Sequence, residues 1–437
     1  MHQSSLAVIL AAGKGTRMRS KTPKVLHPVG GLPMVHHVLA AAKAAGVGST
    51  ALVVAPDATW PQALPEPPAT FVQDPPQGTA HALLCAKPAF AEGPDVVLVL
   101  YADTPLMRPA TIARMVARVR DGADVAVLAF RPADPAGYGR LLMEGDRLTA
   151  IREHRDATDA ERAIPLCNSG ILAIRAGAPL EALGAIGNDN AKGEYYLTDL
   201  IEIGHAKGFA MVVEEAGEDE VMGVDDRAKL AKAEAVFQAR ARAAALACVT
   251  LEAPDTVHFS HDTVLEADVV VEPNVVFGPG VHVGAGARIR AFSHLEGARV
   301  APGAIVGPYA RLRPGADVGA DARIGNFVEI KNATIADGAK VNHLSYVGDA
   351  SVGAGANLGA GTITCNYDGV VKATTTIGEG AFIGSNSALV APVTIGPRAY
   401  VGSGSVITED VPGEALAIAR GRQATKPDRS PARRKPS

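Results

Sequence analysis

The sequence has few aromatic residues and no strong excess of charge. Aromatic side chains make up 4% of the 437 residues, and the formal net charge is −4. A nearly balanced charge argues against nucleic acid as the main partner. The cysteines are scattered and form no Cys-x-x-Cys pair, which argues against a zinc or redox centre and favours a reducing compartment. They are Cys85, Cys167, Cys248 and Cys365.

Long apolar runs and a leader segment are also missing. Residues 6–12 are apolar, but no basic region precedes them and glycines follow, so we interpret them as a buried strand rather than a signal peptide. No apolar run approaches the length that spans a bilayer. We therefore expect a cytoplasmic protein without a membrane span.

Glycine and proline, by contrast, are abundant, with 46 and 30 residues, and much of this glycine belongs to a repeat. Aliphatic or aromatic residues recur six apart from Leu265 to Leu295, from Val300 to Ile330 and from Ile377 to Ile407, with shorter steps between these runs. A six-residue unit fits one flat side of a triangular coil, with the aliphatic residue inside and a following Gly permitting the corner. The second half is therefore expected to be a parallel β-helix.

One gap in the repeat is longer than its neighbours. Between Leu358 and Ile377 lies the polar segment 364–369, TCNYDG. Insertions in such coils become loops on one face, often the working face. We expect a loop there.

The first half is typical of a doubly wound α/β domain. Short apolar runs at 6–10 and 96–100 indicate parallel strands, and residues 34–45 indicate a helix between them. Because 437 residues exceed one ordinary core, at least two domains are expected. We expect the α/β domain over 1–225, a linker helix over 226–250, the β-helix over 251–420 and a basic, disordered tail over 421–437.

A glycine-rich segment leaves the first strand. Residues 10–18 are LAAGKGTRM, which is neither a Walker loop nor the dinucleotide fingerprint. Glycines at a strand exit let backbone N–H groups approach a phosphate, and Lys14, Arg17 and the later Lys24 add positive charge. Taken alone, many such exits are only tight turns.

The combination of motifs is more specific. Residues 10–18, Pro23-Lys24, QGTA at 77–80 and YAD at 101–103 resemble the nucleoside-triphosphate transferases that activate sugar 1-phosphates. The resemblance implies a Mg²⁺ ion held by an Asp at a strand end, where Asp103 lies. The ion offsets the triphosphate charge while the sugar phosphate attacks the α-phosphorus in line, and no enzyme nucleophile is needed.

Further motifs narrow the resemblance. GYGR at 137–140, IREH at 151–154, NSG at 168–170 and GEYY at 193–196 are similar to bacterial N-acetylglucosamine-1-phosphate uridylyltransferases. That family also carries glucosamine-1-phosphate N-acetyltransferase on a C-terminal left-handed β-helix, and the resemblance covers nearly the whole chain. It implies acetylation of glucosamine 1-phosphate by acetyl-CoA, then UMP transfer from UTP to N-acetylglucosamine 1-phosphate. The products are pyrophosphate and UDP-N-acetylglucosamine, a precursor for peptidoglycan and lipopolysaccharide.

The same resemblance implies site residues in the first domain. Lys24 and Arg17 are expected to act in catalysis, and Asp103 and Asp225 to hold the metal. The family usually has Asn where Gly-Val-Asp225 stands here, but Asp is also an oxygen ligand for magnesium. An alternative role for Asp225 is to cap the following helix. The nucleotide and sugar contacts are expected to be Leu10, Ala11, Ala12, Gly13, Lys24, Gln73, Gly78, Thr79, Tyr101, Asp103, Gly139, Glu153, Asn168 and Asp225.

In the β-helix, the resemblance implies an acetyl-transfer site around His343. An amine that attacks a thioester needs a base effective near neutral pH, and imidazole suits that task. The family's site forms between subunits of a homotrimer. Cys365 suggests an acyl-cysteine route, but no base is evident beside it, so direct transfer is favoured. The substrate and coenzyme contacts are expected to be Arg313, Lys331, Tyr346, Asn357, Ala360, Asn366, Tyr367, Lys372, Ser385, Ser403 and Arg420.

Two other functions compete with the bifunctional one. The chain could be a uridylyltransferase whose β-helix only supports oligomerisation, but such a scaffold needs neither His343 nor the loop around Asn366. A binding or regulatory module without catalysis is disfavoured because Lys24 and Asp103 occur together.

Overall fold

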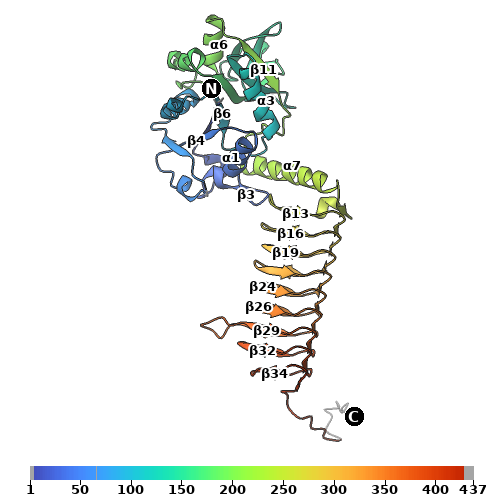
Figure 1. The fold of residues 1–437 in the computed structure, drawn as a ribbon. Coiled ribbons are helices and arrows are strands. Elements are labelled where there is room, and N and C mark those ends of the chain that lie inside the picture. Colours follow the sequence, from blue (N-terminus) through green and yellow to red (C-terminus); the bar gives the residue numbers. More distant parts are fainter. Residues whose placement is uncertain (1–3, 65, 428–437) are drawn as a thin grey trace, which may run out of the picture. The chain divides into compact units, whose positions relative to one another are not determined.

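A computed structural model describes residues 4–64 and 66–427 (Figure 1). The chain divides into two compact units, one up to Phe237 and one from Gln238 onwards. The expected domain limits at 225, 250 and 420 stay a prediction. No helix within the described residues is long and apolar enough to cross a membrane.

The first unit is built on one twisted sheet that is mostly parallel. Strand β10 runs antiparallel to both of its neighbours, and the hairpin of β8 (Arg140–Glu144) and β9 (Arg147–Arg152) extends from it. The runs expected to form strands at 6–10 and 96–100 do so. In spatial order, the strands are β11 (Met211–Glu215), β7 (Val125–Phe130), β10 (Cys167–Arg175), β6 (Val96–Tyr101), β1 (Ser5–Ala11), β4 (Ser49–Val54) and β5 (Ala69–Val72).

Helices cover both faces of this sheet, so the doubly wound fold is confirmed. Alternate residues of β1 point to opposite faces. Ala7 and Ile9 share a buried cluster with residues of α1 and α3, whereas Leu6 and Val8 share another with residues of α2 and α6. The helices are α1 (Met34–Ala44), α2 (Thr79–Cys85), α3 (Pro109–Arg120), α4 (Asp159–Arg162), α5 (Ala178–Glu181) and α6 (Asp199–Ala206); β2 (Pro28–Val29) and β3 (Leu32–Pro33) form a small separate ribbon.

Helix α7 (Arg227–Ala245) lies in the stretch expected to join the domains. Its first turn is capped by Asp226, whose carboxylate accepts a hydrogen bond from the Lys229 amide at 2.8 Å. The capping role considered for Asp225 therefore belongs to its neighbour, and the Asp225 carboxylate is available for other contacts.

The second unit is a parallel β-helix whose short strands stack as rungs (Figure 1). Val270 pairs with Arg288, eighteen residues later, as three six-residue sides require. Across a five-residue step, His282 pairs with Arg299 instead. The expected hexapeptide coil is confirmed, and its inward ladder residues, such as Val271 and Val283, are buried in one continuous core.

Two sheets contain the rungs. One consists of β12 (Thr250–Leu251), β14 (Val270–Val271), β17 (Arg288–Ile289), β20 (Ile305–Val306), β23 (Arg323–Asn326), β25 (Lys340–His343), β27 (Asn357–Leu358), β30 (Phe382–Ile383), β33 (Tyr400–Val401) and β35 (Leu416–Ala417). The other sheet forms the two remaining sides of the triangular coil. These two sides belong to one sheet because the long strands β24 and β26 continue around the corner between them. It consists of β13 (Val264–Leu265), β15 (Val276–Phe277), β16 (His282–Val283), β18 (His294–Leu295), β19 (Ala298–Val300), β21 (Arg311–Leu312), β22 (Ala316–Val318), β24 (Glu329–Ile335), β26 (Tyr346–Val352), β28 (Ile363–Cys365), β29 (Thr375–Ile377), β31 (Ala388–Val390), β32 (Val393–Ile395) and β34 (Val406–Ile407).

Two glycines that follow ladder residues, Gly284 and Gly319, serve a different purpose from the expected one, although Gly307 does have a positive φ of 98°. A Cβ atom on Gly284 or Gly319 would lie 2.7 Å from backbone atoms of the next coil. Neither glycine has a positive φ, which occurs instead at other positions such as Gly286 and Asp321. These glycines are required because adjacent coils approach closely, not because the backbone angle of a corner demands them.

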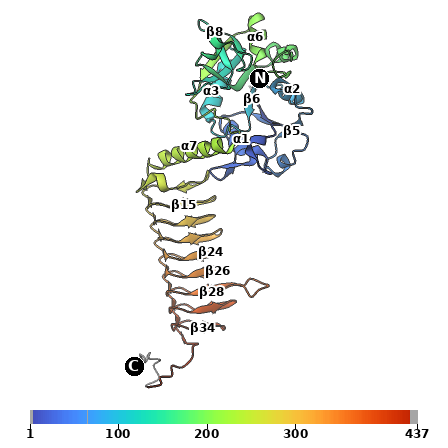
Figure 2. The same cartoon turned by 180° about the vertical axis from the view of Figure 1, so that it is seen from behind.

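The long gap in the repeat forms a loop that projects from the stack (Figure 2). After β28, Tyr367 and Lys372 form an antiparallel bridge, and Asp368 closes the turn by accepting hydrogen bonds from the Val370 and Val371 amides. The expected loop is confirmed. Residues 421–427 are exposed and contain no helix or strand, and the rest of the expected basic tail lies outside the described residues.

Candidate functional sites

The carboxyl ends of β1 and β6 bring together the first group of predicted residues. These strands are adjacent and parallel, with Leu10 opposite Tyr101. The Ala102 amide donates to the Leu10 carbonyl at 3.1 Å, and Asp103 then forms an ion pair with Lys24. Ligands bind outside this edge in open α/β sheets. Lys24 and Asp103 therefore stand where a nucleotide would be expected.

Glycine at the exit of β1 lets the loop fold closely around Lys24. Gly15 has a φ of 59°, and a Cβ atom there would lie 2.6 Å from the Lys24 Cβ. A Cβ atom on Gly13 would lie 3.8 Å from the Lys24 ammonium nitrogen. The loop predicted to bind phosphate therefore packs closely against Lys24, a predicted catalytic residue.

Asp225 joins the same group from a distant part of the sequence. The neighbouring Val224 amide donates to the Asp103 carbonyl at 2.8 Å. One Asp225 carboxylate oxygen contacts Arg17 at 2.8 Å and Lys229 at 3.1 Å. Its other oxygen is buried and has no hydrogen-bond partner among the described residues.

These carboxylates fit the magnesium ion that the resemblance implies. In the described part of the chain, no group of three or more His, Cys, Asp or Glu residues could hold a metal. Magnesium, however, commonly takes only one or two protein carboxylates and completes its shell with water and substrate phosphates. Asp103 and Asp225, tied by the Val224 hydrogen bond, supply such a pair, including one unpartnered buried oxygen.

A polar pocket of about 300 Å³ opens beside this group. Six predicted residues line it, namely Thr79, Tyr101, Asp103, Gly139, Glu153 and Asn168. It is also lined by Lys192 and Thr198, which the sequence analysis did not select. The pocket has the size and polarity for one sugar ring.

Burial controls protonation in the pocket. It raises the pKa of Glu153, an effect opposed mainly by the hydroxyl of Thr198, which donates to the Glu153 carboxylate at 3.3 Å. Burial also raises the pKa of Tyr101, and the charges of Asp103 and Glu153 add to this effect. The phenol therefore stays neutral and can donate a hydrogen bond.

The QGTA motif at 77–80 is hydrogen-bonded to the GEYY motif at 193–196 and to Leu197, which follows it. The Tyr195 amide donates to the Gln77 carbonyl at 2.8 Å, and the Leu197 amide donates to the Thr79 hydroxyl at 3.0 Å. Gly78 has a φ of 107°, and a Cβ atom there would lie 2.5 Å from the Tyr195 carbonyl oxygen. The predicted uridine-binding loop is thus held against the edge of the sugar pocket.

In the β-helix, His343 is oriented by a residue one coil earlier. Its Nδ1 lies 2.7 Å from the Asn326 side-chain oxygen, so Nδ1 carries the proton and Nε2 is left as an acceptor. The imidazole is exposed. A general base requires an oriented and accessible imidazole whose Nε2 can accept a proton.

Other predicted residues continue from His343 along successive coils. The Gly361 amide donates to the His343 carbonyl, and the Asn386 amide donates to the Ala360 carbonyl. The Gly404 amide in turn donates to the Ser385 carbonyl, and Arg420 donates to the Ser403 carbonyl at 2.5 Å. We call this line the His343 row; it consists of Asn326, His343, Ala360, Ser385, Ser403 and Arg420.

A second group of predicted residues contains the cations. Arg313 contacts Glu329 at 2.8 Å, and Glu329 stands opposite Tyr346 in the strand register. Asn332 and Asn366 donate to Asp349 and lower its pKa, with Lys331 and Lys372 adding to the effect. We call this set the cation group; it consists of Arg313, Lys331, Tyr346, Asn366 and Lys372.

The structure does not join the His343 row to the cation group. Over residues 4–64 and 66–427, no hydrogen bond or ion pair connects a member of one to a member of the other. Asn357 pairs with Phe382 in the sheet that also contains His343, and Tyr367 is 58% exposed on the projecting loop. Within the described part of one chain, the predicted acetyl-transfer residues thus fall into two groups that no direct hydrogen bond or ion pair joins.

Several residues that hold the predicted ones in place were not among the residues predicted from sequence. They are Thr198 for Glu153, Lys229 for Asp225, Asn326 for His343 and Asp349 for Asn366. A signal existed for two of them, since Asn326 and Asp349 each lie seventeen residues, one short coil, before their partners. Thr198 and Lys229 depend on tertiary contacts that carry no such spacing.

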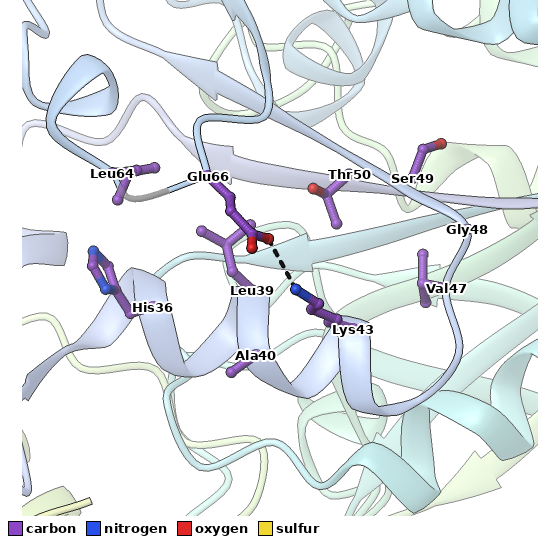
Figure 3. Close-up of a pocket in the computed structure, with 10 residues that line it drawn as sticks. All are labelled: His36, Leu39, Ala40, Lys43, Val47, Gly48, Ser49, Thr50, Leu64 and Glu66. Carbon is purple, nitrogen blue, oxygen red and sulfur yellow. Dashed lines mark hydrogen bonds and ion pairs between the residues drawn. The ribbon is translucent and has the colours of Figure 1, made fainter. Parts of the chain in front are cut away.

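A further cavity of about 420 Å³ lies between α1 and the loop before β5 (Figure 3). Lys43 and Glu66 form an ion pair at its rim at 2.9 Å, and both side chains are largely exposed. None of the predicted site residues lines it. We assign it no part in either site.

Comparison with known proteins agrees with the division of the chain into an α/β unit and a β-helix unit. Residues 7–165 match the family model of the MobA-like NTP transferase domain, and residues 262–297 and 374–409 match that of the bacterial transferase hexapeptide. Three similar relatives are each named bifunctional protein GlmU. Those of Azorhizobium caulinodans and Xanthobacter autotrophicus are 58% identical, covering 97% of this chain and 96% of each relative. That of Agrobacterium fabrum is 54% identical, covering 99% of this chain and 97% of the relative.

Proposed function

We propose how two activities are divided in this chain, which belongs to the family of bifunctional GlmU proteins. The α/β unit transfers UMP from UTP to N-acetylglucosamine 1-phosphate and releases pyrophosphate. The β-helix unit makes that sugar phosphate by acetylating glucosamine 1-phosphate with acetyl-CoA. The product is UDP-N-acetylglucosamine, a precursor for peptidoglycan and lipopolysaccharide. A cytoplasmic location follows from the need for UTP and acetyl-CoA.

The observation that carries the first activity is the group at the carboxyl edge of β1 and β6. Lys24 and Arg17 neutralise phosphate charge, and the backbone of residues 10–13 approaches the nucleotide. Glu153, Asn168 and Gly139 hold the sugar in the adjacent pocket. Magnesium, held by Asp103 and Asp225, supplies further neutralisation of the triphosphate. With both reactants positioned, no enzyme nucleophile is required.

His343 carries the second activity. Its exposed Nε2 accepts a proton from the sugar amine as that amine attacks the thioester, and the thiolate of coenzyme A leaves. Asn326 fixes the ring orientation and tautomer. The cation group binds phosphate, either of the sugar or of the coenzyme.

A homotrimer completes this second site. Phe292, Tyr309, Phe327 and Leu344 occupy one corner of successive coils, each with a positive φ between 50° and 58°. The ring centroids of Phe292 and Tyr309 lie 4.9 Å apart, and those of Tyr309 and Phe327 lie 5.3 Å apart. This apolar stripe is about half exposed, as surfaces that bind a partner often are. It ends at Leu344, directly after His343, so a second subunit on the stripe would bring its own groups to that base.

The alternative, a uridylyltransferase with a purely structural β-helix, accounts for the coil and the apolar stripe. This alternative does not explain the 2.7 Å contact between Asn326 and His343, nor the cations around Asp349.

One assay separates these functions. The purified protein is given glucosamine 1-phosphate, acetyl-CoA, UTP and Mg²⁺, and free thiol and pyrophosphate are followed separately. We expect thiol release first and pyrophosphate release dependent on it. Pyrophosphate from N-acetylglucosamine 1-phosphate, with no thiol from glucosamine 1-phosphate, would support the scaffold alternative. A fragment ending at Ala247 should keep only pyrophosphate release.

A further inference from the structure

The side chain of Gln73 is held in one orientation within the α/β unit. This residue follows β5, and its side chain is 5% exposed. Its amide nitrogen Nε2 donates to the Gly78 carbonyl at 2.9 Å and lies 3.3 Å from His81 Nδ1. Within the described residues, no hydrogen bond to its oxygen Oε1 is found. Both amide hydrogens are therefore engaged, and the oxygen is the free end.

His81 can accept one of these hydrogens because of its own surroundings. It lies on α2, one turn before Cys85, and its Nε2 is 3.9 Å from the Cys85 sulfur. A neutral imidazole carries one N–H, and the neighbouring thiol, whose pKa is raised by burial, is uncharged and a weak acceptor. With the hydrogen on Nε2 facing sulfur, Nδ1 is the acceptor that faces Gln73.

The orientation of this carboxamide matters for base recognition. Uracil carries a hydrogen on N3, whereas cytosine has a bare acceptor at N3. A carboxamide that presents its oxygen accepts from the uracil N3–H, and the same oxygen would meet an unpaired acceptor in cytosine. A site built to pair a polar group discriminates strongly against a base that leaves the group unpaired.

We propose that His81 is a positioning residue that holds the Gln73 carboxamide with its oxygen toward the base, and thereby sets the preference for UTP over CTP. The inference rests on the proposed uridine contact of Gln73. His81 acts only through Gln73, and Gly78 provides the second anchor, so loss of His81 weakens the preference without abolishing it.

A matched pair of substitutions tests this role. His81→Asn keeps an acceptor at the δ position, whereas His81→Leu has nearly the same size and no acceptor. KM and kcat are measured for UTP and for CTP in the full-length protein, at saturating N-acetylglucosamine 1-phosphate and Mg²⁺. Because one neutral hydrogen bond is lost, we expect His81→Leu to raise the KM for UTP by about 3- to 10-fold and to lower the UTP-over-CTP ratio of kcat/KM by at least as much, with kcat for UTP nearly unchanged. His81→Asn should keep a ratio within about twofold of the parent, the size of effect expected when the hydrogen bond is retained.

Two further variants separate the ways in which the inference can fail. Gln73→Leu should lower the ratio more than His81→Leu; an unchanged ratio in Gln73→Leu would contradict the proposed uridine contact itself. If Gln73→Leu lowers the ratio and His81→Leu does not, the role of His81 is overturned while the uridine site stands. Cys85→Ala removes only a weak acceptor at Nε2, while the Gln73 amide still favours an unprotonated Nδ1, so this variant should keep the ratio. Equal losses in His81→Asn, His81→Leu and Cys85→Ala would assign the effect to packing of α2 and overturn the positioning role.

Discussion

The two units of this protein arrange their functional side chains in opposite ways. In the α/β unit, pairs of residues from remote parts of the sequence meet at one edge of a sheet: Arg17 contacts Asp225, and Lys24 contacts Asp103. In the β-helix, residues such as Asn326 and His343 follow each other at the period of the coil. The first arrangement forms a pocket on one chain, whereas the second presents an exposed row that a neighbouring chain completes in the proposed trimer.

The difference predicts how each site responds to damage. A compact pocket loses activity when one contact in its network is broken, but it does not depend on subunit contacts. A row on a coil tolerates the loss of an exposed side chain without loss of stability, because no cavity is created. Four substitutions test this difference between the two units.

The largest effect is expected for His343→Ala. A positioned base contributes about 10²- to 10⁴-fold, so acetyl transfer should fall by roughly two or more orders of magnitude. Uridylyl transfer and the melting temperature should stay nearly unchanged, since the imidazole is exposed. Thiol release from acetyl-CoA, measured beside a melting curve, tests this. His294→Ala, at another exposed histidine on a β-helix strand, is the matched control and should change neither activity. Near-normal acetylation in a folded His343→Ala variant would remove the support for the general base.

A large loss confined to the other unit is expected for Asp103→Asn. This change removes the negative charge of the proposed metal ligand and its ion pair with Lys24, and uridylyl transfer should fall about 100-fold, the size of effect that metal-ion catalysis supplies. Asp225→Asn introduces the residue that the family usually has at this position, and an amide oxygen can still bind magnesium, so this change should cost far less. A magnesium titration of both variants compares them. Greater damage from Asp225→Asn would show that the metal site is assigned wrongly.

A smaller loss is expected when the apolar stripe is charged. Phe327→Asp puts a carboxylate into the proposed subunit contact, so the trimer should dissociate and acetyl transfer should fall by about tenfold or more. Uridylyl transfer should persist, because its pocket lies within one chain. Light scattering coupled to size-exclusion chromatography reports the mass. An intact trimer, or a monomer with full acetylation, would contradict the shared site.

The smallest effect is a pH-dependent gain of stability in the α/β unit. Burial raises the pKa of Asp199 to about 6, with the charges of Glu202 and Glu153 adding to it. In an unfolded chain this carboxyl titrates near 3.9, so its ionised form destabilises the folded state as pH rises from about 4 to 6. Asp199→Asn removes that penalty and should raise the melting temperature by about 2–4 °C at pH 7.5, a shift that corresponds to a modest gain in free energy. The gain should fade toward pH 4; a gain of equal size at both pH values would contradict the titration of Asp199.

The periodic parts of the molecule were predictable from sequence, and the reason is physical. A six-residue spacing of buried side chains has one structural solution, so the β-helix, its core and its projecting loop followed directly. The strand exit and Asp103 were also predictable, because apolar runs mark the strands that carry them. The explanation of the ladder glycines required the structure, since only the distance between coils shows that Gly284 and Gly319 are constrained by a neighbour. The same holds for Thr198, Lys229 and His81, whose roles depend on side chains that folding brings beside them.

Each unit of the protein is proposed to catalyse one step of the same synthesis. Mixing Asp103→Asn with His343→Ala, each full length, tests it most directly through formation of UDP-N-acetylglucosamine from glucosamine 1-phosphate, acetyl-CoA, UTP and Mg²⁺. Each variant alone should form almost none, because one lacks uridylyl transfer and the other lacks acetyl transfer. The mixture should form it readily, since N-acetylglucosamine 1-phosphate made by one variant is consumed by the other. A mixture as inactive as its components, when each retains its remaining half-reaction, would contradict the division.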